Sequence, residues 1–173
     1  MKQFLIVIDG PMGSGKTTIG TLMHKKLKRT ALVSTERIKW FVSDFKRGPE
    51  DNKMTADVLF AMCEEYIKQG VNLLIPQGFW KKEYLDKFID LAKKNNLELF
   101  VYQLETPKEI LLKRLAERPT PVLATSRVPK ARILKNLKTW EENRYNLGRV
   151  FDTSKQSAEQ ITKVILKEVK NKT

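Results

Sequence analysis

The sequence predicts an α/β fold of three layers, in which a five-stranded parallel sheet is covered by helices on both faces. Short apolar runs alternate along the chain with segments of helical periodicity, and parallel strands require such crossover connections. The first run, Phe4–Ile8, is apolar at every position, which is typical of a strand buried on both faces. With 173 residues, 41% of them hydrophobic, the chain has the size of one domain, and no repeat or linker divides residues 1–173.

Five segments are expected to form strands because apolar residues run together in them between polar or glycine-containing stretches. In chain order they are Phe4–Ile8, Ala31–Val33, Val71–Pro76, Leu97–Leu104 and Arg149–Phe151. Proline lacks the amide hydrogen that a strand ladder needs, so Pro76 is expected to end the third strand.

The segments between the strands are expected to be helical because their apolar residues recur at intervals of three or four. In chain order they are Thr17–Leu27, Glu36–Phe45, Ala56–Lys68, Tyr84–Lys94, residues 106–118, residues 129–145 and Ser157–Lys170. Thr106-Pro107 favours a helix start, since a hydroxyl cap precedes proline in the first turn. Gly48–Asn52 and residues 119–129 are expected to be loops.

Composition excludes several classes of protein. One cysteine, Cys63, permits no disulfide within the chain, and a single histidine, His24, does not support a zinc site. The apolar start runs into Asp9 and a glycine loop rather than into a signal-peptide cleavage site, and no apolar run approaches the roughly 18 residues of a membrane helix. We therefore expect a soluble, cytoplasmic protein without membrane contact.

The charge is strongly basic, with 33 Lys and Arg against 20 Asp and Glu, a net charge of +13. Residues 107–149 hold 11 basic and 4 acidic residues, so 7 of the 13 excess charges fall in this quarter of the chain. Such clustering favours a polyanionic partner. The alternative is a lysine-rich surface that serves solubility. No oligomeric state follows from the sequence.

Residues Gly10–Thr17 read GPMGSGKT and match the P-loop (Walker A) pattern G-x-x-x-x-G-K-[ST] at every position. They follow an apolar strand and precede a helix, so backbone amides and a helix N-terminus converge on one point. Lys16 would reach the β- and γ-phosphates, and the Thr17 hydroxyl would lie on Mg²⁺. The expected nucleotide-binding residues are Gly10, Gly13, Ser14, Gly15, Lys16, Thr17 and Thr18. The motif predicts binding of a nucleoside triphosphate but does not by itself show phosphoryl transfer.

With this motif, the chain resembles the small P-loop kinases of the adenylate-kinase-like clan. The resemblance is closer to the group that contains polynucleotide 5′-kinases, gluconate and shikimate kinases and antibiotic phosphotransferases. It spans the chain from Phe4 to the last helix, although only the P-loop is a highly specific motif. It implies a P-loop kinase fold with a short lid at about residues 119–128, and ATP and Mg²⁺ as cofactors.

The family carries an acidic residue after its second strand and a basic residue three positions later. Here Glu36 and Lys39 match that pair, with Glu and Lys in place of the usual Asp and Arg. The resemblance implies that Glu36 accepts the proton of the acceptor hydroxyl and that Lys39 holds the substrate. Residues three apart share one helical face. The alternative is a capped helix start, with Ser34 or Thr35 as the cap.

Leu111–Arg118 resembles the arginine pair that precedes the family's lid, which implies that Arg114 packs on adenine and Arg118 contacts phosphates. Arg127 falls in the lid and is expected on the acceptor side. The alternative is a basic, solvated helix. Asp152 follows the fifth strand, where the family has a loop that contacts adenine. The alternative there is a cap for the last helix.

Gln77 stands at the end of the third strand, where many relatives carry an acidic residue that holds Mg²⁺ through water. Asp9, immediately before the P-loop, is expected to organise the metal together with Thr17 instead. Because ligands in such sheets lie beyond the carboxyl ends of the strands, Trp40 and Gln77 join Glu36 and Lys39 as candidate acceptor-binding residues. For Trp40 the alternative is a place in the core.

Three functions remain open from the sequence. The first is an ATP- and Mg²⁺-dependent kinase, with Lys16, Glu36 and Arg118 as catalytic residues, that phosphorylates a hydroxyl of a nucleic-acid 5′-end or a nucleoside. The basic surplus favours this acceptor. The second is a small-metabolite or antibiotic kinase with the same residues. The third, of another class, is an ATP-binding regulatory module without transfer.

Overall fold

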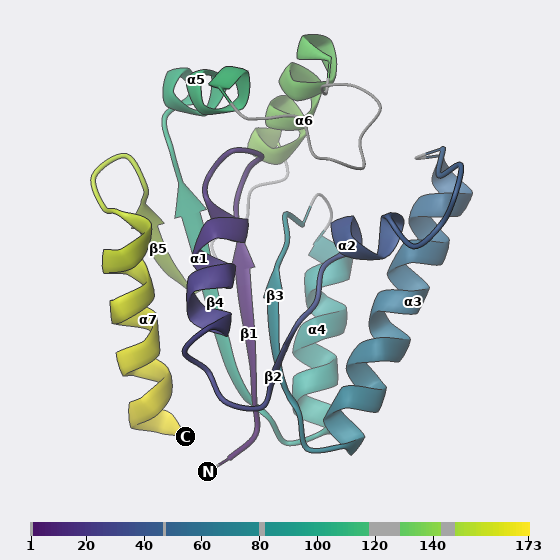
Figure 1. Ribbon diagram of the computed structural model, residues 1–173, viewed down its shortest axis with the longest axis vertical. Coiled ribbons are helices and arrows are strands. Elements are labelled where there is room, and N and C mark those ends of the chain that lie inside the picture. The colour runs from purple at the N-terminus through teal and green to yellow at the C-terminus, as the bar shows by residue number, and fades with distance from the viewer. Residues whose placement is uncertain (1, 47, 80–81, 118–128, 143–147) are drawn as a thin grey trace.

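The computed structural model describes residues 2–46, 48–79, 82–117, 129–142 and 148–173 (Figure 1). Its strands are β1 (Phe4–Asp9), β2 (Thr30–Leu32), β3 (Asn72–Pro76), β4 (Glu98–Glu105) and β5 (Arg149–Asp152). Its helices are α1 (Lys16–His24), α2 (Thr35–Lys39), α3 (Pro49–Lys68), α4 (Lys82–Lys94), α5 (Lys108–Glu117), α6 (Lys130–Glu142) and α7 (Ala158–Lys172). Strands and helices alternate as the sequence predicts.

The five strands form one parallel sheet in the order β2-β3-β1-β4-β5. β1 is central, and all six of its residues are buried, which explains its unbroken apolar sequence. β2 and β3 lie on one side of β1, and β4 and β5 lie on the other. The order in which strands join the sheet therefore changes direction between β3 and β4. Ligands in open parallel sheets bind beyond the carboxyl ends of the strands at such a switch point, and here the segment after β1 is the glycine loop.

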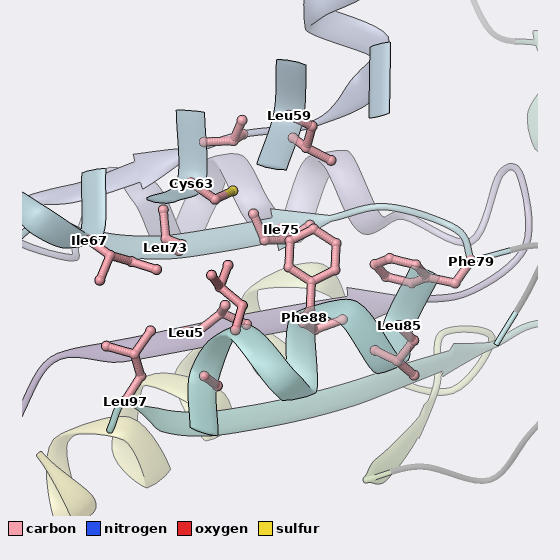
Figure 2. Close-up of a cluster of buried hydrophobic side chains, with 14 of the residues drawn as sticks. Leu5, Leu59, Cys63, Ile67, Leu73, Ile75, Phe79, Leu85, Phe88 and Leu97 are labelled. Carbon is pink, nitrogen blue, oxygen red and sulfur yellow. The ribbon is translucent and has the colours of Figure 1, made fainter. Parts of the chain in front are cut away.

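Helices cover both faces of the sheet, which confirms the three-layer prediction (Figure 1). On one face, Ile19 and Met23 of α1 and Ile161 and Ile165 of α7 pack against alternate residues of β1 and β4. On the other face, α3 and α4 enclose a second cluster, in which Leu5, Leu73 and Ile75 of the sheet meet side chains of both helices (Figure 2). Full burial of each large apolar side chain stabilises the folded state by about 1.5–3 kcal/mol.

α2 is shorter than the sequence predicts, because it ends at Lys39 rather than near Phe45. Beyond Lys39 the amides of Trp40, Phe41 and Val42 donate to carbonyl oxygens three residues earlier, so the chain continues only as tight turns. The side chain of Phe41 is 79% exposed. The apolar spacing in this segment therefore does not mark a core-facing helix.

Gly48–Asn52 is the start of α3, so the prediction of a loop there is wrong. Gly48 is the N-cap, Pro49 occupies the first turn, and Glu50 and Asp51 lie at the positive end of the helix dipole. The same residues that suggested a loop are those that begin a helix well. Within the part of the chain that the structure describes, no helix is long and apolar enough to cross a membrane.

Candidate nucleotide and acceptor site

The glycine loop turns sharply between β1 and α1. At two of its glycines an added side chain would meet neighbouring atoms, and the positive φ angle is one that other residues rarely adopt. Gly10 has φ of 152°, and a Cβ there would lie 2.8 Å from the carbonyl oxygen of Leu104 and from Oγ of Ser14. Gly13 has φ of 87°, and a Cβ there would lie 3.1 Å from Leu115 of α5. The loop is therefore seated against the ends of β4 and α5 with its backbone facing the space above α1.

Lys16 begins α1 and reaches back across the loop. Its ammonium donates to the carbonyl oxygens of Gly10 and Pro11, both at 2.8 Å. Phosphate oxygens are stronger, charge-assisted acceptors, so the same ammonium can transfer to a bound phosphate without a change of backbone. Oγ of Ser14 is fully buried in the loop and has no hydrogen-bond partner among the described residues. Such an orphaned hydroxyl fits a polar ligand or water in the loop.

A cavity of about 690 Å³ lies directly over the loop. Its volume is that of an ordinary small-molecule site. The residues that line it come from the P-loop, α5, the β5–α7 loop and the first turn of α7: Met12–Ile19, Arg114, Leu115, Thr153–Ala158 and Ile161. All seven predicted nucleotide-binding residues of the P-loop except Gly10 line this cavity. Thr17 and Thr18 are exposed to it at the start of α1.

Arg114 lines the same cavity and is held by the β5–α7 loop, while the contact with adenine expected of it stays a prediction. Its guanidinium donates to Oγ1 of Thr153 at 2.9 Å and to the carbonyl oxygen of Thr153 at 2.8 Å. The hydroxyls of Thr106 and Thr153 are 2.6 Å apart, which ties the end of β4 to the same point. The planar group is thereby fixed at the edge of the cavity, where it can stack on a flat ring or pair with an anion.

Asp152 does not line the cavity, although the neighbouring residues 153–158 do. Its carboxylate accepts the amide of Ser154 at 2.9 Å and the Ser154 hydroxyl at 2.5 Å, and these bonds hold the pKa of Asp152 below its usual value. The cap of α7 is Ser157, in a capping box with Gln160. Asp152 therefore shapes the turn that brings Thr153 to Arg114. The sequence contained one signal for Thr153, its place directly after the fifth strand.

Asp9 is buried beneath the loop, with 3% of its surface exposed. One carboxylate oxygen, Oδ1, accepts the amide of Gly10 at 2.7 Å and the amide of Phe79 at 2.9 Å. Burial raises the pKa of Asp9 above its ordinary value of 3.8, while the two amides and the charge of Lys16 oppose the shift. These contacts join the start of the P-loop to the β3–α4 loop, and the metal-binding role expected of Asp9 stays a prediction.

Glu36 and Lys39 lie on one face of α2, and their charged groups are 3.5 Å apart. The Glu36 side chain is 55% exposed, whereas the Lys39 side chain is 15% exposed, and the Lys39 ammonium lies 5.8 Å from the centre of the Phe45 ring. Trp40, at the end of α2, is half-buried. α2 and the P-loop both lie at the carboxyl ends of the strands (Figure 1). The structure thus presents an exposed carboxylate at the end of the sheet that carries the phosphate loop.

Gln77 follows β3 and is half-buried between β1 and α2. Its amide donates to the carbonyl oxygen of Ile8 at 3.0 Å, and its side-chain oxygen accepts the amide of Thr35 at 3.0 Å. Phe79 is 2% exposed and belongs to the core. Arg118, Arg127 and the predicted lid at 119–128 lie outside the described residues, so their predicted roles are neither supported nor opposed here.

Comparisons with known proteins support the fold. A family model described as an AAA domain matches residues 5–142. No curated protein sequence matches the chain. Among solved structures, the APS kinase of Mycobacterium tuberculosis in complex with AMPPNP and APS is similar with a TM-score of 0.72 and 13% identity, covering 98% of each chain.

Two further solved structures are similar over most of their length. A sugar kinase of Janibacter has a TM-score of 0.69 and 21% identity, with 95% of this chain and 93% of that chain covered. The tunicamycin resistance protein of Deinococcus radiodurans has a TM-score of 0.65 and 18% identity, with 97% and 96% covered. The fold is that of the small P-loop kinases, and the chain belongs to the AAA-domain family of P-loop proteins whose model spans residues 5–142.

Proposed function

We propose that this protein is an ATP- and Mg²⁺-dependent kinase that transfers the γ-phosphoryl group of ATP to a hydroxyl of an acceptor. The observation that carries the proposal is that two features lie at the same end of the sheet. The phosphate loop, with its lysine and a nucleotide-sized cavity, lies at the carboxyl ends of the strands, and so does the exposed Glu36 carboxylate. A module that only binds nucleotide has no need of an acidic side chain there.

The residues of the cavity fit a magnesium nucleotide. The Thr17 hydroxyl is exposed at the start of α1, where the phosphates would lie, and is the protein ligand that we propose for the ion. No cluster of three or more His, Cys, Asp or Glu side chains that could hold a metal occurs in the described segments. This fits an ion held mostly by phosphate oxygens and water. When bound, Mg²⁺ neutralises charge on the β- and γ-phosphates.

In the proposed reaction the acceptor hydroxyl loses its proton to the carboxylate of Glu36 as its oxygen bonds to the γ-phosphorus. The bond from that phosphorus to the β–γ bridging oxygen breaks, and ADP leaves with the electron pair. Lys16 moves from the carbonyl oxygens of Gly10 and Pro11 to the phosphates, where it balances the developing charge. Arg114 orients the nucleotide, and we assign Arg118 to the phosphates and Arg127 to the acceptor side of the lid.

Replacing Glu36 with Gln tests the assignment of the base. The variant Glu36→Gln should lose turnover by about 10²–10⁴-fold and retain the affinity for ATP, since general base catalysis contributes about that much. Glu65→Gln is the matched control, because Glu65 pairs with Lys68 at 3.4 Å in the same i, i+3 arrangement on an exposed helix. Its turnover should equal that of the wild type. Unchanged transfer by Glu36→Gln would remove Glu36 from the mechanism.

We infer that the acceptor is a small molecule with a free hydroxyl. The similar structures named above are an APS kinase, a sugar kinase and a tunicamycin resistance protein, and this chain matches them over nearly its whole length. The chain is therefore large enough to form an acceptor-binding site of similar size.

A nucleic-acid end is the second candidate acceptor, favoured by charge. Helix α6 exposes four basic side chains: Lys130, Arg132, Lys135 and Lys138. Among these four, Lys138 pairs with Glu142. Labelling of oligonucleotides that weakens steeply with added salt would favour this acceptor. Salt-insensitive labelling of a small molecule would favour the first.

A further inference from the structure

We infer that Gln77 is a positioning residue that holds α2, and with it the carboxylate of Glu36, at a fixed place relative to the phosphate loop. The inference rests on the proposed function, and it departs from the view of Gln77 as a neutral replacement for a metal ligand or as a direct contact of the acceptor.

α2 is too short to hold itself in place. It has five residues, and isolated helices below about 12–15 residues are marginal in water. Ser34 stands at its N-cap position with an extended backbone, but its side chain makes no capping hydrogen bond. The amides at the start of such a helix need partners from elsewhere.

Gln77 supplies one of these partners from a distant part of the sequence. Its side-chain oxygen accepts the amide of Thr35, the residue immediately before Glu36, at 3.0 Å. Only the oxygen of the amide group can accept an N–H, so this contact also fixes which way the side chain faces. With this oxygen committed to α2, Gln77 acts on the first turn of the helix that carries the proposed base.

The backbone around Gln77 is tied to the other side of the site. The amide of Gln77 donates to the carbonyl oxygen of Ile8 in β1 at 3.0 Å. Two residues later, the amide of Phe79 and the amide of Gly10 donate to the same oxygen of Asp9. A continuous set of hydrogen bonds therefore runs from the first glycine of the phosphate loop through Asp9 and the β3–α4 loop to α2.

A neutral amide suits this position better than a carboxylate. Gln77 lies one hydrogen bond from the residue before Glu36, and the loop that it begins is bonded to the buried Asp9. A carboxylate at this position would add a like charge to a region that already holds those of Glu36 and Asp9. The residue therefore combines an acceptor for the helix amide with no added charge.

Three variants separate positioning from the other roles. Gln77→Leu removes the acceptor for the Thr35 amide, and we expect kcat to fall about 10–100-fold with the KM for ATP and for the acceptor unchanged, since small misplacements of a reacting group cost this much. Gln77→Glu keeps an oxygen at the same reach, so kcat should recover.

Gln3→Leu is the matched control. The side-chain amide of Gln3 also bonds to backbone, donating to the carbonyl oxygens of Val71 at 2.8 Å and Ile67 at 3.3 Å, but it lies beside the first residue of β1 at the opposite edge of the sheet. Both leucine variants lose side-chain hydrogen bonds to the backbone. Only Gln77→Leu should change kcat.

Hydrogen exchange gives a reading that does not depend on activity. Amides of residues 34–40 should exchange at least several-fold faster in Gln77→Leu than in the wild type, and at the wild-type rate in Gln3→Leu. Unchanged kcat and unchanged exchange in Gln77→Leu would overturn the proposal. So would a rise only in the acceptor KM, which means direct contact, or a Gln77→Glu variant more active than the wild type at lower Mg²⁺, which means a metal ligand.

The proposed function can fail separately. A wild-type protein that transfers phosphate to nothing contradicts the kinase assignment and with it the catalytic role of Gln77, whereas faster exchange of residues 34–40 would then still show that Gln77 secures α2.

Discussion

Arg114 donates two hydrogen bonds to Thr153, one to its hydroxyl at 2.9 Å and one to its carbonyl oxygen at 2.8 Å. The two residues come from α5 and from the loop after β5, 39 positions apart, and both line the cavity over the phosphate loop. The pairing of β4 with β5 brings the two segments together, and this contact fixes their side chains as one wall of the cavity. The affinity for nucleotide should therefore depend on it.

Arg114→Lys should weaken ATP binding about tenfold or more, because a lysine cannot make both contacts in the plane of the guanidinium and charged hydrogen bonds contribute about 1.5–3 kcal/mol. Titration calorimetry with ATP measures this. Arg29→Lys is the matched control, since the Arg29 guanidinium also donates two hydrogen bonds. They go to the carbonyl oxygens of Gln69 and Gly70, at the opposite end of the sheet from the phosphate loop. Equal affinity of the two variants for ATP would contradict the role of Arg114.

Asp9→Asn should increase stability near neutral pH. Burial raises the folded pKa of Asp9 above 3.8, so ionisation is more costly in the folded than in the unfolded chain. The stability that Asp9 permits is therefore greatest below its unfolded pKa and decreases as pH rises through the folded pKa. Asparagine keeps an oxygen for the amides of Gly10 and Phe79 without that cost.

Urea unfolding of both proteins between about pH 3.5 and pH 8 checks this prediction. The advantage of Asp9→Asn should be absent at the acidic end and should grow as pH rises. A wild-type protein that gains stability over Asp9→Asn as pH rises would show that the carboxylate is stabilised in its charged form. A large rise in the Mg²⁺ requirement of the variant would restore Asp9 as a metal-binding residue.

Cys63 should be unreactive in the native protein. The side chain is fully buried in α3, and burial raises the pKa of the thiol to about 12, so almost no thiolate is present at neutral pH. A thiol reagent such as DTNB should label one cysteine per chain after denaturation and almost none before. Rapid labelling of the native protein would show that α3 opens away from the sheet.

Gly20→Ala should destabilise the protein although alanine favours helices. Gly20 lies in α1 against β3, and a Cβ there would be 2.9 Å from Cγ of Pro76. The overlap costs about 1–3 kcal/mol, more than the gain of about 1 kcal/mol in helix propensity. Each net 1 kcal/mol lowers Tm by about 2–4 °C at this chain length. Gly48→Ala, which has no atom within 4 Å of the added carbon, is the control without overlap, and it should lower Tm only by the loss of a better N-cap residue.

Local features of the site could be predicted from the sequence, and contacts between distant segments could not. The phosphate loop is a short motif whose strand, turn and helix are encoded within about a dozen residues, so each of its residues was assigned in advance. Thr153 and Gln77 act through partners 39 and 42 positions away, and no spacing in the sequence joins those pairs. The sequence points to the stretch from Asp152 to Ser154 but to Asp152 as its site residue, whereas the residue that lines the cavity and binds Arg114 is Thr153.

The length of α2 shows the limit of periodicity. Phe41 and Val42 have the spacing of a core-facing helix, yet they are 79% and 38% exposed. Periodicity predicts which side chains share a face, but whether anything packs on that face depends on the rest of the fold. At Gly48–Asn52 the error ran the other way, because glycine and proline begin a helix as readily as they interrupt one.

Transfer of label from γ-labelled ATP to an acceptor is the decisive test of whether this protein is a kinase. The protein is incubated with Mg²⁺ and, in parallel, with 5′-hydroxyl oligonucleotides, nucleosides, sugars and a small-molecule extract of cells. We expect label on one small hydroxyl compound, with the labelling lost in Glu36→Gln and retained in Glu65→Gln. Tight ATP binding with no label on any acceptor would contradict the assignment as a kinase, and label on the oligonucleotide alone would replace the small-molecule acceptor with a nucleic-acid end.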